Sequence, residues 1–367
     1  MSEETRKRKA DHIRICLDQK AQAKKITTGF EDLRFVHRAL PEIDKHKIEL
    51  PTTFLGHRFS APLFVGAMTG GTPKSARINA AIAEAVEKLN LGMGVGSQRA
   101  AIEDKKLEET YSITRKKAPN AFLVANIGGV QLVHGYGLKE VKNAVEMIDA
   151  DAVAIHLNAL QEAIQPEGQT NFNGVLAKIG EIAGEIEKPV IVKETGSGIS
   201  AEEAKKLEAA GVKALDIGGA GGTSFAAVEY YRAEGEGKAH QSALGESFWD
   251  WGIPTVVSLV ETIRSVDIPI IASGGVRCGT DAAKALALNA DLASVTQPVL
   301  EAAVKGSAEV ERLLSSITEE VRNVMFLVGA DKVESLARVP IVITGNTAEW
   351  LKTRGFDVDE SARRGAS

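Results

Sequence analysis

The sequence predicts an α/β protein built on a (β/α)8 TIM barrel, with an N-terminal extension and a long insertion after the sixth strand. Short apolar runs alternate with amphipathic helical stretches, which is typical of a parallel sheet. Eight such units follow one another within about 240 residues, and this favours a closed barrel over an open doubly wound sheet of fewer strands. The chain has 367 residues, 44% of them hydrophobic, and can bury one large core.

The predicted strands are the apolar runs at 61–67, 91–96, 121–127, 151–157, 189–194, 213–218, 268–274 and 291–295. The stretch 74–89 repeats Ile, Val and Leu side chains on one helical face, as expected for a helix that covers a barrel. Another helix begins with Ser200 as its N-cap and Glu203 as the capping-box partner, and it ends at Gly211.

The chain divides into three parts around this repeat. We expect residues 1–60 to pack on the barrel or close over it, residues 61–345 to form the barrel, and residues 346–367 to form a C-terminal tail. The insertion at 219–253 is rich in glycine and aromatic residues. Connections of that length in a compact domain are usually functional lids or disordered segments.

Charge and composition argue against several classes of function. The formal net charge of −5 and the pI near 5.9 give no general attraction to nucleic acid or acidic membranes. No run is long and apolar enough to span a bilayer, and the N-terminus does not have the pattern of a signal peptide. Cys16 and Cys278 are too few for a disulfide framework or a cysteine metal site, so we expect a cytoplasmic protein.

Polar residues stand at the ends of seven predicted strands. In a barrel these ends meet on one face, where the active site is built. In strand order they are Met68 and Thr69; Ser97, Gln98 and Arg99; Asn126; His156, Asn158, Gln161 and Glu162; Lys193; Thr223; and Gly274, Gly275 and Arg277. Any strand ends in a polar loop, but seven such ends together indicate a site.

Three of these ends suggest a phosphorylated cofactor with a heteroaromatic ring. Gly274 and Gly275 expose backbone N–H groups before a helix N-terminus, at the place where TIM barrels often bind phosphate. Lys193 ends an apolar strand, and its ammonium could form a Schiff base or place positive charge beside an electron-rich ring. Asn126 can donate and accept hydrogen bonds at once, which suits the edge of such a ring.

Several motifs together resemble the type 2 isopentenyl diphosphate isomerases, which are FMN enzymes on a (β/α)8 barrel. The similarity covers nearly the whole chain, through RKRKADHI, AMTGG, GVGSQRAA, VANIGG, AIHLNALQE, VKETGSGIS, GGAGGTSFAAVE, WDWGIPT and ASGGVR. AMTGG, GSQR and HLNALQE in one chain are specific, whereas ASGGVR is shared by many FMN barrels.

The resemblance implies a role for each matched residue. It implies FMN contacts from Ala67, Met68, Thr69, Ser97, Asn126, Lys193, Thr223, Gly274, Gly275 and Arg277. It implies substrate contacts from Arg8, Lys9, Ser97, Gln98, Arg99, His156, Asn158 and Gln161. It further implies a Mg2+ contact from Glu162 and a supporting acid at Glu229. The chain reads ASVTQP where the family more often has a glycine and a small apolar pair, which makes Thr296 and Gln297 the expected phosphate contacts there.

The implied reaction interconverts isopentenyl and dimethylallyl diphosphate, adding a proton at C4 and removing one from C2 without net redox change. FMN would therefore work in its reduced form, with N5 as the proton carrier, and NADPH would serve only to reduce it. Lys193 beside the N1 and C2 carbonyl edge would stabilise the anionic ring, and Gln161 would hold or relay a proton near the allylic carbon. Mg2+ on Glu162 would neutralise the diphosphate. We expect a small diphosphate as the substrate and further copies of the chain, in a homo-oligomer, as partners.

Three other functions remain open from the sequence. An FMN oxidoreductase of the hydroxy-acid oxidase or dihydroorotate dehydrogenase type would share the phosphate site and the lysine, but would need a catalytic His or Cys over the flavin. An inosine monophosphate dehydrogenase needs a loop cysteine, and Cys16 and Cys278 lie outside the insertion. A flavin or phosphate binder without turnover would have the same spacing. Glu162, Arg8 and Lys9 favour the diphosphate enzyme.

Overall fold

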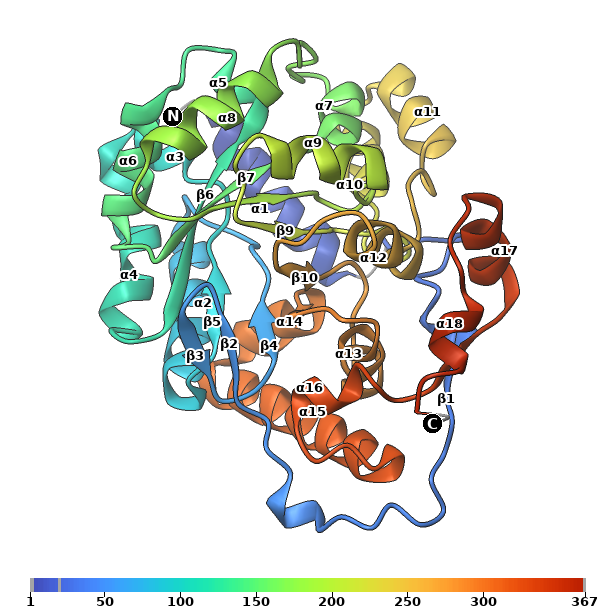
Figure 1. Ribbon diagram of the computed structural model, residues 1–367. Coiled ribbons are helices and arrows are strands. Elements are labelled where there is room, and N and C mark those ends of the chain that lie inside the picture. The colour runs from blue at the N-terminus through green and yellow to red at the C-terminus, as the bar shows by residue number, and fades with distance from the viewer. Residues whose placement is uncertain (1–2, 19–20, 366–367) are drawn as a thin grey trace.

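Eight parallel strands close into a barrel in the computed structural model, which describes residues 3–18 and 21–365, with the backbone alone for residues 3–7 (Figure 1). The barrel strands are β4 (Leu63–Val65), β5 (Gly92–Gly94), β6 (Phe122–Gly128), β7 (Ala152–His156), β8 (Val190–Lys193), β9 (Ala214–Asp216), β10 (Ile270–Ala272) and β11 (Leu292–Val295). They follow chain order around the barrel, and β11 pairs with β4 in parallel. The predicted TIM barrel is confirmed, and each strand falls on a predicted apolar run.

Helices surround these strands (Figure 1). They are α1 (Glu3–Leu17), α2 (Pro73–Leu89), α3 (Arg99–Glu103), α4 (Glu109–Lys117), α5 (Gly129–Leu132), α6 (Leu138–Met147), α7 (Ala159–Ile164), α8 (Val175–Glu185), α9 (Ala201–Ala209), α10 (Phe225–Gly235), α11 (Ala239–Ser247), α12 (Thr255–Ile263), α13 (Gly279–Ala287), α14 (Gln297–Lys305), α15 (Ser307–Val328), α16 (Val333–Leu336), α17 (Gly345–Thr353) and α18 (Asp359–Ala362). As predicted, the Ser200 hydroxyl caps α9 by accepting a hydrogen bond of 3.3 Å from the Glu203 backbone N–H.

The amino-terminal end of the barrel is closed by apolar side chains. The hairpin of β2 (Thr52–Phe54) and β3 (His57–Phe59) places Phe54 and Phe59 against Phe122 of β6. These rings join the strand side chains that fill the barrel interior in one buried cluster. The opposite end, where the strands stop, is therefore the end that can be polar and open.

The two ends of the chain are joined by a small antiparallel sheet. β1 (Leu33–Phe35) pairs with β12 (Ile341–Ile343), with Leu33 opposite Ile343. The stretch expected to be a C-terminal tail contains α17 and α18, and it buries Leu351 and Val358. Those two side chains belong to the main hydrophobic core, so this stretch packs on the barrel.

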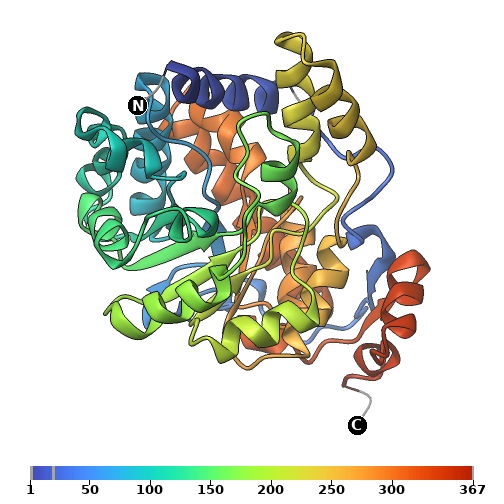
Figure 2. The ribbon, with the colours of Figure 1, turned by 90° about the horizontal axis from the view of Figure 1, so that it is seen from above.

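The N-terminal helix and the insertion meet at the carboxyl end of the barrel. α1 packs against α10 and α14, and Figure 2 shows α1 lying beside the helix pair of the insertion. The insertion at 219–253 is ordered: it forms α10 and α11, which pack closely on each other. Ile15 of α1 packs in one buried cluster with Val228 of α10 and with Trp249. Both segments therefore cover the open end of the barrel.

Candidate active site

A cavity lies at the carboxyl ends of the barrel strands, beneath α1. The predicted residues that line it are Arg8, Lys9, Ala67, Met68, Thr69, Ser97, Arg99, Asn126, His156, Asn158, Gln161, Glu162, Lys193, Thr223, Thr296 and Gln297. A second cavity shares Ala67, Lys193 and Thr223 with the first and adds Gly274, Gly275 and Arg277. The structure thus brings together residues from α1 and from strand ends far apart in the sequence.

Two predicted residues do not line either cavity. The Gln98 side chain is fully buried, donates to the Ala144 carbonyl at 2.8 Å and accepts from the Asn126 backbone N–H at 2.8 Å. Gln98 therefore packs between β6 and α6, away from the other residues predicted to contact substrate. Glu229 is also fully buried, but it lies directly behind the cavity and contacts residues that line it.

Glycine allows three backbone segments to approach one another closely beside the second cavity. Gly274 and Gly275 have φ angles of 100° and 76°. A Cβ at Gly274 would lie 2.1 Å from the Gly219 carbonyl oxygen, and one at Gly275 would lie 2.5 Å from the Thr28 side chain. Glycine is therefore required at both positions. Arg277 follows them and donates to Gln297 Oε1 at 2.9 Å.

A row of ionisable side chains crosses three neighbouring strands at the cavity floor. His156, Lys193 and Asp216 are paired in register across β7, β8 and β9. Burial raises the pKa of Asp216, which accepts a hydrogen bond from Ser273. Burial also raises the pKa of Glu194 to about 7, although its carboxylate accepts from three successive backbone N–H groups. Lys193 is the cation of this row, and its Nζ donates to the Glu194 backbone carbonyl at 2.7 Å.

His156 is held in one tautomer by Asn126. Asn126 donates through Nδ2 to the Val95 carbonyl at 2.9 Å, so its Oδ1 is the atom that faces His156 Nδ1, 2.8 Å away. An amide oxygen can only accept, and the neutral ring therefore carries its proton on Nδ1. Burial, together with the charges of Lys193, Lys9 and Arg8, lowers the pKa of His156 to about 3. The ring is neutral at pH 7 and has a lone pair on Nε2.

Lys9 of α1 is fixed by two oxygen atoms of the barrel. Its Nζ donates to the Tyr111 hydroxyl at 2.7 Å and to the Ser97 carbonyl at 3.0 Å. The Tyr111 ring lies against Gly70, where a Cβ would be 1.9 Å from a ring carbon. Burial and the neighbouring Arg8 lower the pKa of Lys9 to about 7. The ammonium therefore titrates close to neutral pH.

Glu162 stands in the first turn of α7 among side-chain amides. Its Oε1 accepts from Asn158 Nδ2 at 2.9 Å, and its Oε2 accepts from Gln165 Nε2 at 2.5 Å and from the Gln169 backbone N–H at 2.7 Å. Asn158 Oδ1 and Gln165 Oε1 are buried and have no hydrogen-bond partner among the described residues. A carboxylate flanked by two unpaired carbonyl oxygens suits a hard cation such as Mg2+. No group of three His, Cys, Asp or Glu side chains that could hold a metal occurs in the described part of the chain.

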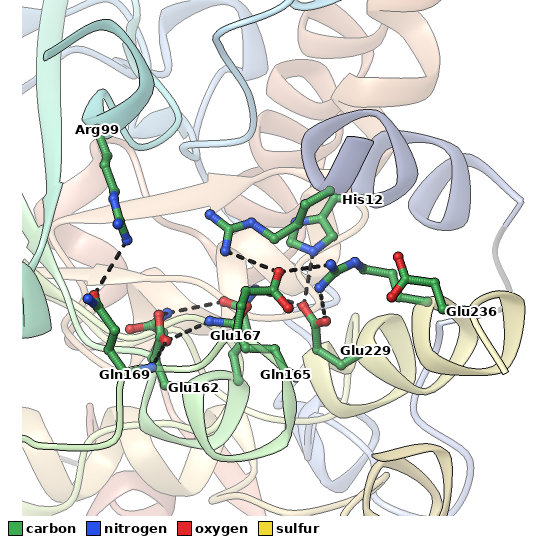
Figure 3. Close-up of polar contacts among 12 residues, drawn as sticks. His12, Arg99, Glu162, Gln165, Glu167, Gln169, Glu229 and Glu236 are labelled. Carbon is green, nitrogen blue, oxygen red and sulfur yellow. Dashed lines mark hydrogen bonds and ion pairs between the residues drawn. The ribbon is translucent and has the colours of Figure 1, made fainter. Parts of the chain in front are cut away.

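Glu229 of α10 joins the insertion to both the N-terminal helix and the fourth strand end (Figure 3). Its Oε1 lies 3.0 Å from His12 Nε2 and accepts from Gln161 Nε2 at 3.0 Å, and its Oε2 accepts from Arg232. Burial alone would raise the pKa of Glu229, but the hydrogen bond and charge of His12, with the charge of Arg232, hold this pKa at about 2. The residue is therefore a carboxylate at neutral pH.

The structure also places in or around the site residues that the sequence did not indicate, Gln165 and four others among them. The four others are His12, Tyr111, Glu167 and Arg232. One signal was available for His12, because it follows Arg8 by four residues and so shares a helical face with it. Arg232 likewise follows Glu229 by three residues on α10, whereas Tyr111 and Glu167 reach the site through contacts between distant segments.

Comparison with curated proteins finds relatives along the full length of the chain. It is 49% identical over 363 residues to an isopentenyl-diphosphate delta-isomerase of Methanosarcina barkeri, with 99% of each protein covered. It is 51% identical over 368 residues to a protein of the same name from Pyrococcus furiosus, with 98% of this chain and 92% of that protein covered. A family model described as FMN-dependent dehydrogenase matches residues 1–125 and 133–342.

Solved structures share the fold at much lower identity. A lactate oxidase of Pediococcus acidilactici superimposes with a TM-score of 0.66 at 18% identity, over 94% of each chain. A flavocytochrome b2 variant superimposes with a TM-score of 0.66 at 18% identity, over 95% of this chain and 85% of that one. At such identity the likeness concerns the fold alone.

Proposed function

The chain belongs to the isopentenyl-diphosphate delta-isomerases within the FMN-dependent dehydrogenase family, and on that premise we propose that it interconverts isopentenyl diphosphate and dimethylallyl diphosphate for isoprenoid biosynthesis. One observation carries the proposal beyond the family name. Arg8 and Lys9 of α1 face the same cavity as Glu162, and that cavity adjoins the glycine segments at Gly274 and Gly275. A diphosphate carries several negative charges and needs several cationic donors with a divalent cation, whereas the single carboxylate of a simple hydroxy acid needs no divalent cation.

The residues around the second cavity fit FMN. The close backbone approach at Gly274 and Gly275, followed by Arg277, gives a phosphate access to N–H groups and a guanidinium. Met68, Asn126 and Lys193 would hold the ring where the two cavities meet. Reduced FMN, when bound, supplies a ring nitrogen that can exchange a proton, so the isomerisation needs no net redox change. We assign NADPH as the reductant of the flavin.

The substrate diphosphate would be bound by α1, α3 and the fourth strand end. Arg8, Lys9 and Arg99 line the cavity and supply positive charge there. Neutral His156 can donate a hydrogen bond from Nδ1 only, and Asn126 already accepts that bond. Its Nε2 could donate to a phosphate oxygen only after taking up a proton, and the charge of a bound diphosphate favours that uptake. Mg2+ would be held by Glu162, with Asn158 Oδ1 or Gln165 Oε1, diphosphate oxygens and water completing its shell.

Gln161 is the residue best placed to handle a proton beside the substrate carbons. Its Nε2 donates to Glu229, which orients the amide, and its Oε1 accepts a hydrogen bond of 3.3 Å from Asn158. An amide oxygen is a weak base, so Gln161 would hold and relay a proton at Oε1 with the Glu229 carboxylate behind it. Ionised Glu229 acts here by orienting Gln161 and by stabilising positive charge, and it has no proton to donate at neutral pH.

The oxidoreductase alternative is less supported. A flavin-dependent hydroxy-acid oxidase needs a base that accepts a proton near pH 7. His12 and His156 both line the cavity. The Nε2 of His12 is committed to Glu229, and a pKa of about 3 makes His156 a weak base. Its Nδ1 is also committed to Asn126.

We further propose a homo-oligomer in a reducing compartment, the cytoplasm. Cys16 and Cys278 are both free thiols, as a reducing compartment requires. Val36, Leu40 and Leu327 expose apolar side chains, and the Arg38 backbone N–H bonds the Leu327 carbonyl, so these residues neighbour one another. Light scattering would measure the number of subunits.

No helix within the described residues has the length and apolar character needed to cross a membrane.

The proposal is tested with purified protein reconstituted with FMN. After anaerobic photoreduction, isopentenyl diphosphate and MgCl2 should give dimethylallyl diphosphate, measured by NMR. Oxidised protein and protein without Mg2+ are the controls and should be inactive. A reduced, flavin-loaded protein that forms no product would refute the function, and bleaching of the oxidised flavin by lactate or dihydroorotate would favour the oxidoreductase.

A further inference from the structure

Arg232 of α10 is a buried cation for which the proposed reaction has no role. Its side chain is only 3% exposed, and it does not line the cavity. Its Nη1 donates to Glu229 Oε2, and its Nη2 donates to Glu167 Oε1 at 2.9 Å. A single guanidinium therefore serves two carboxylates that come from α10 and from the loop after α7 (Figure 3). Burying an arginine is costly unless such partners are present.

Both carboxylates also contact the N-terminal helix. Glu229 Oε1 lies 3.0 Å from His12 Nε2, and Glu167 Oε1 lies 3.4 Å from Arg8 Nη1. Arg8 and His12 are four residues apart, so they lie on one face of α1. Each carboxylate thus has one partner on α10, the buried Arg232, and a second partner on α1.

The two contacts of Glu167 differ in a way that matters for substrate binding. Arg232 is the nearer and more buried partner, whereas Arg8 is 18% exposed and lines the cavity. If Arg8 turns from Glu167 to a diphosphate, Glu167 keeps Arg232 and is not left without a cation. Without Arg232, Arg8 would be the one cation left on Glu167 among the side chains that the structure describes, and substrate would have to compete with Glu167 for it.

We propose that Arg232 is a positioning residue, the fixed counter-charge of both Glu167 and Glu229. Because Glu167 keeps this cation, Arg8 is free to move to the substrate diphosphate. Because Glu229 is held by it, Glu229 keeps Gln161 in place. This inference rests on the proposed function for the identity of the substrate. It assigns Arg232 two separable effects, one on diphosphate binding through Glu167 and one on turnover through Glu229.

The experiment uses the reduced FMN enzyme and three variants. Arg232→Met should raise KM for isopentenyl diphosphate at least about fivefold and lower kcat at least about tenfold, because both carboxylates lose their shared cation. Adding Glu167→Gln to Arg232→Met should return KM to within about twofold of wild type, because nothing then competes for Arg8, while kcat stays low. Arg232→Lys keeps the charge and should recover part of both effects.

The control is Arg115→Met. It removes another partly buried arginine, which contacts Asp151 and backbone carbonyls away from the cavity, and it should leave KM and kcat unchanged.

A merely structural arginine predicts a different result. The second substitution would then add to the first, and KM of the double variant would rise further or stay high. That outcome, or wild-type KM and kcat in Arg232→Met, would overturn the inference. If Arg232→Met does not fold, Arg232→Lys with and without Glu167→Gln gives the same KM comparison.

Binding of inorganic pyrophosphate with MgCl2, measured by calorimetry, repeats the comparison without turnover. Weaker binding in Arg232→Met that the double variant restores supports the role of Arg232 even if the wild type forms no dimethylallyl diphosphate. If Arg232→Met binds pyrophosphate as tightly as wild type, the proposed role of Arg232 is wrong. Absence of turnover in the wild type, in contrast, would refute the proposed function only.

Discussion

Lys9 on the N-terminal helix lies 2.7 Å from the hydroxyl of Tyr111, a buried residue of α4. The Tyr111 hydroxyl itself donates to the Ser97 carbonyl at 2.6 Å, and Lys9 donates to that carbonyl as well. The ammonium is thus fixed at the cavity wall by two neutral oxygens and has no carboxylate in hydrogen-bond contact among the described residues. An anionic substrate would supply that missing counter-charge.

The first prediction concerns the pH dependence that follows from Lys9. Its pKa of about 7 means that free enzyme carries the charge below pH 7 and loses it above. The value of kcat/KM for isopentenyl diphosphate should therefore fall by up to about tenfold per pH unit above pH 7. Lys9→Arg stays charged and should remove this decline, although at a lower plateau because the guanidinium fits the Tyr111 contact less well. A decline of the same slope in Lys9→Arg would show that another group titrates.

The second prediction concerns stability in acid. The pKa of His156 falls from 6.5 to about 3 on folding, so between these values the unfolded chain binds a proton that the folded chain does not. The free energy of unfolding is therefore undiminished by this group above pH 6.5 and decreases as the pH falls towards 3. The decrease is about 2 kcal/mol between pH 6.5 and pH 5. His156→Gln should lose less stability than wild-type apoprotein over this interval in urea unfolding. Exposed His46 is the control, and His46→Gln should lose as much stability as wild type. If His156→Gln also loses as much as wild type, the low pKa assigned to His156 is wrong.

Much of this site could be predicted because a parallel barrel gathers its strand ends on one face. Apolar runs located the eight strands, and the polar residues that follow each run therefore shared a cavity. Gln98, expected to contact substrate, does not line the cavity. It lies in the turn between β5 and α3, where the two-residue alternation of a strand no longer indicates which way a side chain points. Its neighbours Ser97 and Arg99 do line the cavity.

Contacts between distant segments could not be predicted. Glu167 and Arg232 are 65 residues apart, and Arg8 and Glu167 are 159 apart. No periodicity in one sequence indicates that these side chains meet. For the same reason the pairing of β1 with β12, which joins the two ends of the chain, was not expected from the apolar pattern. Such contacts depend on where α1 and the insertion pack, which only the folded chain decides.

The third prediction concerns Lys193 and the flavin. Lys193→Ala removes the cation from the row that it forms with His156 and Asp216 but leaves the apolar part of β8 intact. The midpoint potential of bound FMN should fall by at least about 30 mV, because a positive charge stabilises the reduced ring. Spectroelectrochemistry measures this, and turnover should fall more than FMN affinity. Unchanged potential and turnover would mean that Lys193 is only a strand-end lysine.

The fourth prediction concerns Glu229. Glu229→Gln places an amide donor where Gln161, His12 and Arg232 all approach a carboxylate. We expect kcat to fall about tenfold to a hundredfold, with KM for isopentenyl diphosphate changed less than about twofold, because the carboxylate acts behind Gln161 rather than on the diphosphate. Steady-state kinetics of the reduced enzyme measure both. A change in KM alone would reassign Glu229 to substrate binding.

The last prediction concerns the carboxylate proposed to hold Mg2+. Glu162→Gln keeps the shape of the side chain and removes its charge, and a neutral amide is a poorer ligand for a hard cation. The Mg2+ concentration for half-maximal activity should rise at least about tenfold, which corresponds to roughly 1.4 kcal/mol. FMN affinity should not change, because Glu162 lines only the cavity on the side of α1 and not the one next to Gly274 and Gly275. Glu181→Gln, which removes an exposed carboxylate paired with Lys178 on α8, is the matched control for the change in net charge. Metal titrations of wild type and Glu162→Gln that superimpose would rule out Glu162 as a ligand and leave the amide donors of Asn158 and Gln165 as a structural cap of its carboxylate.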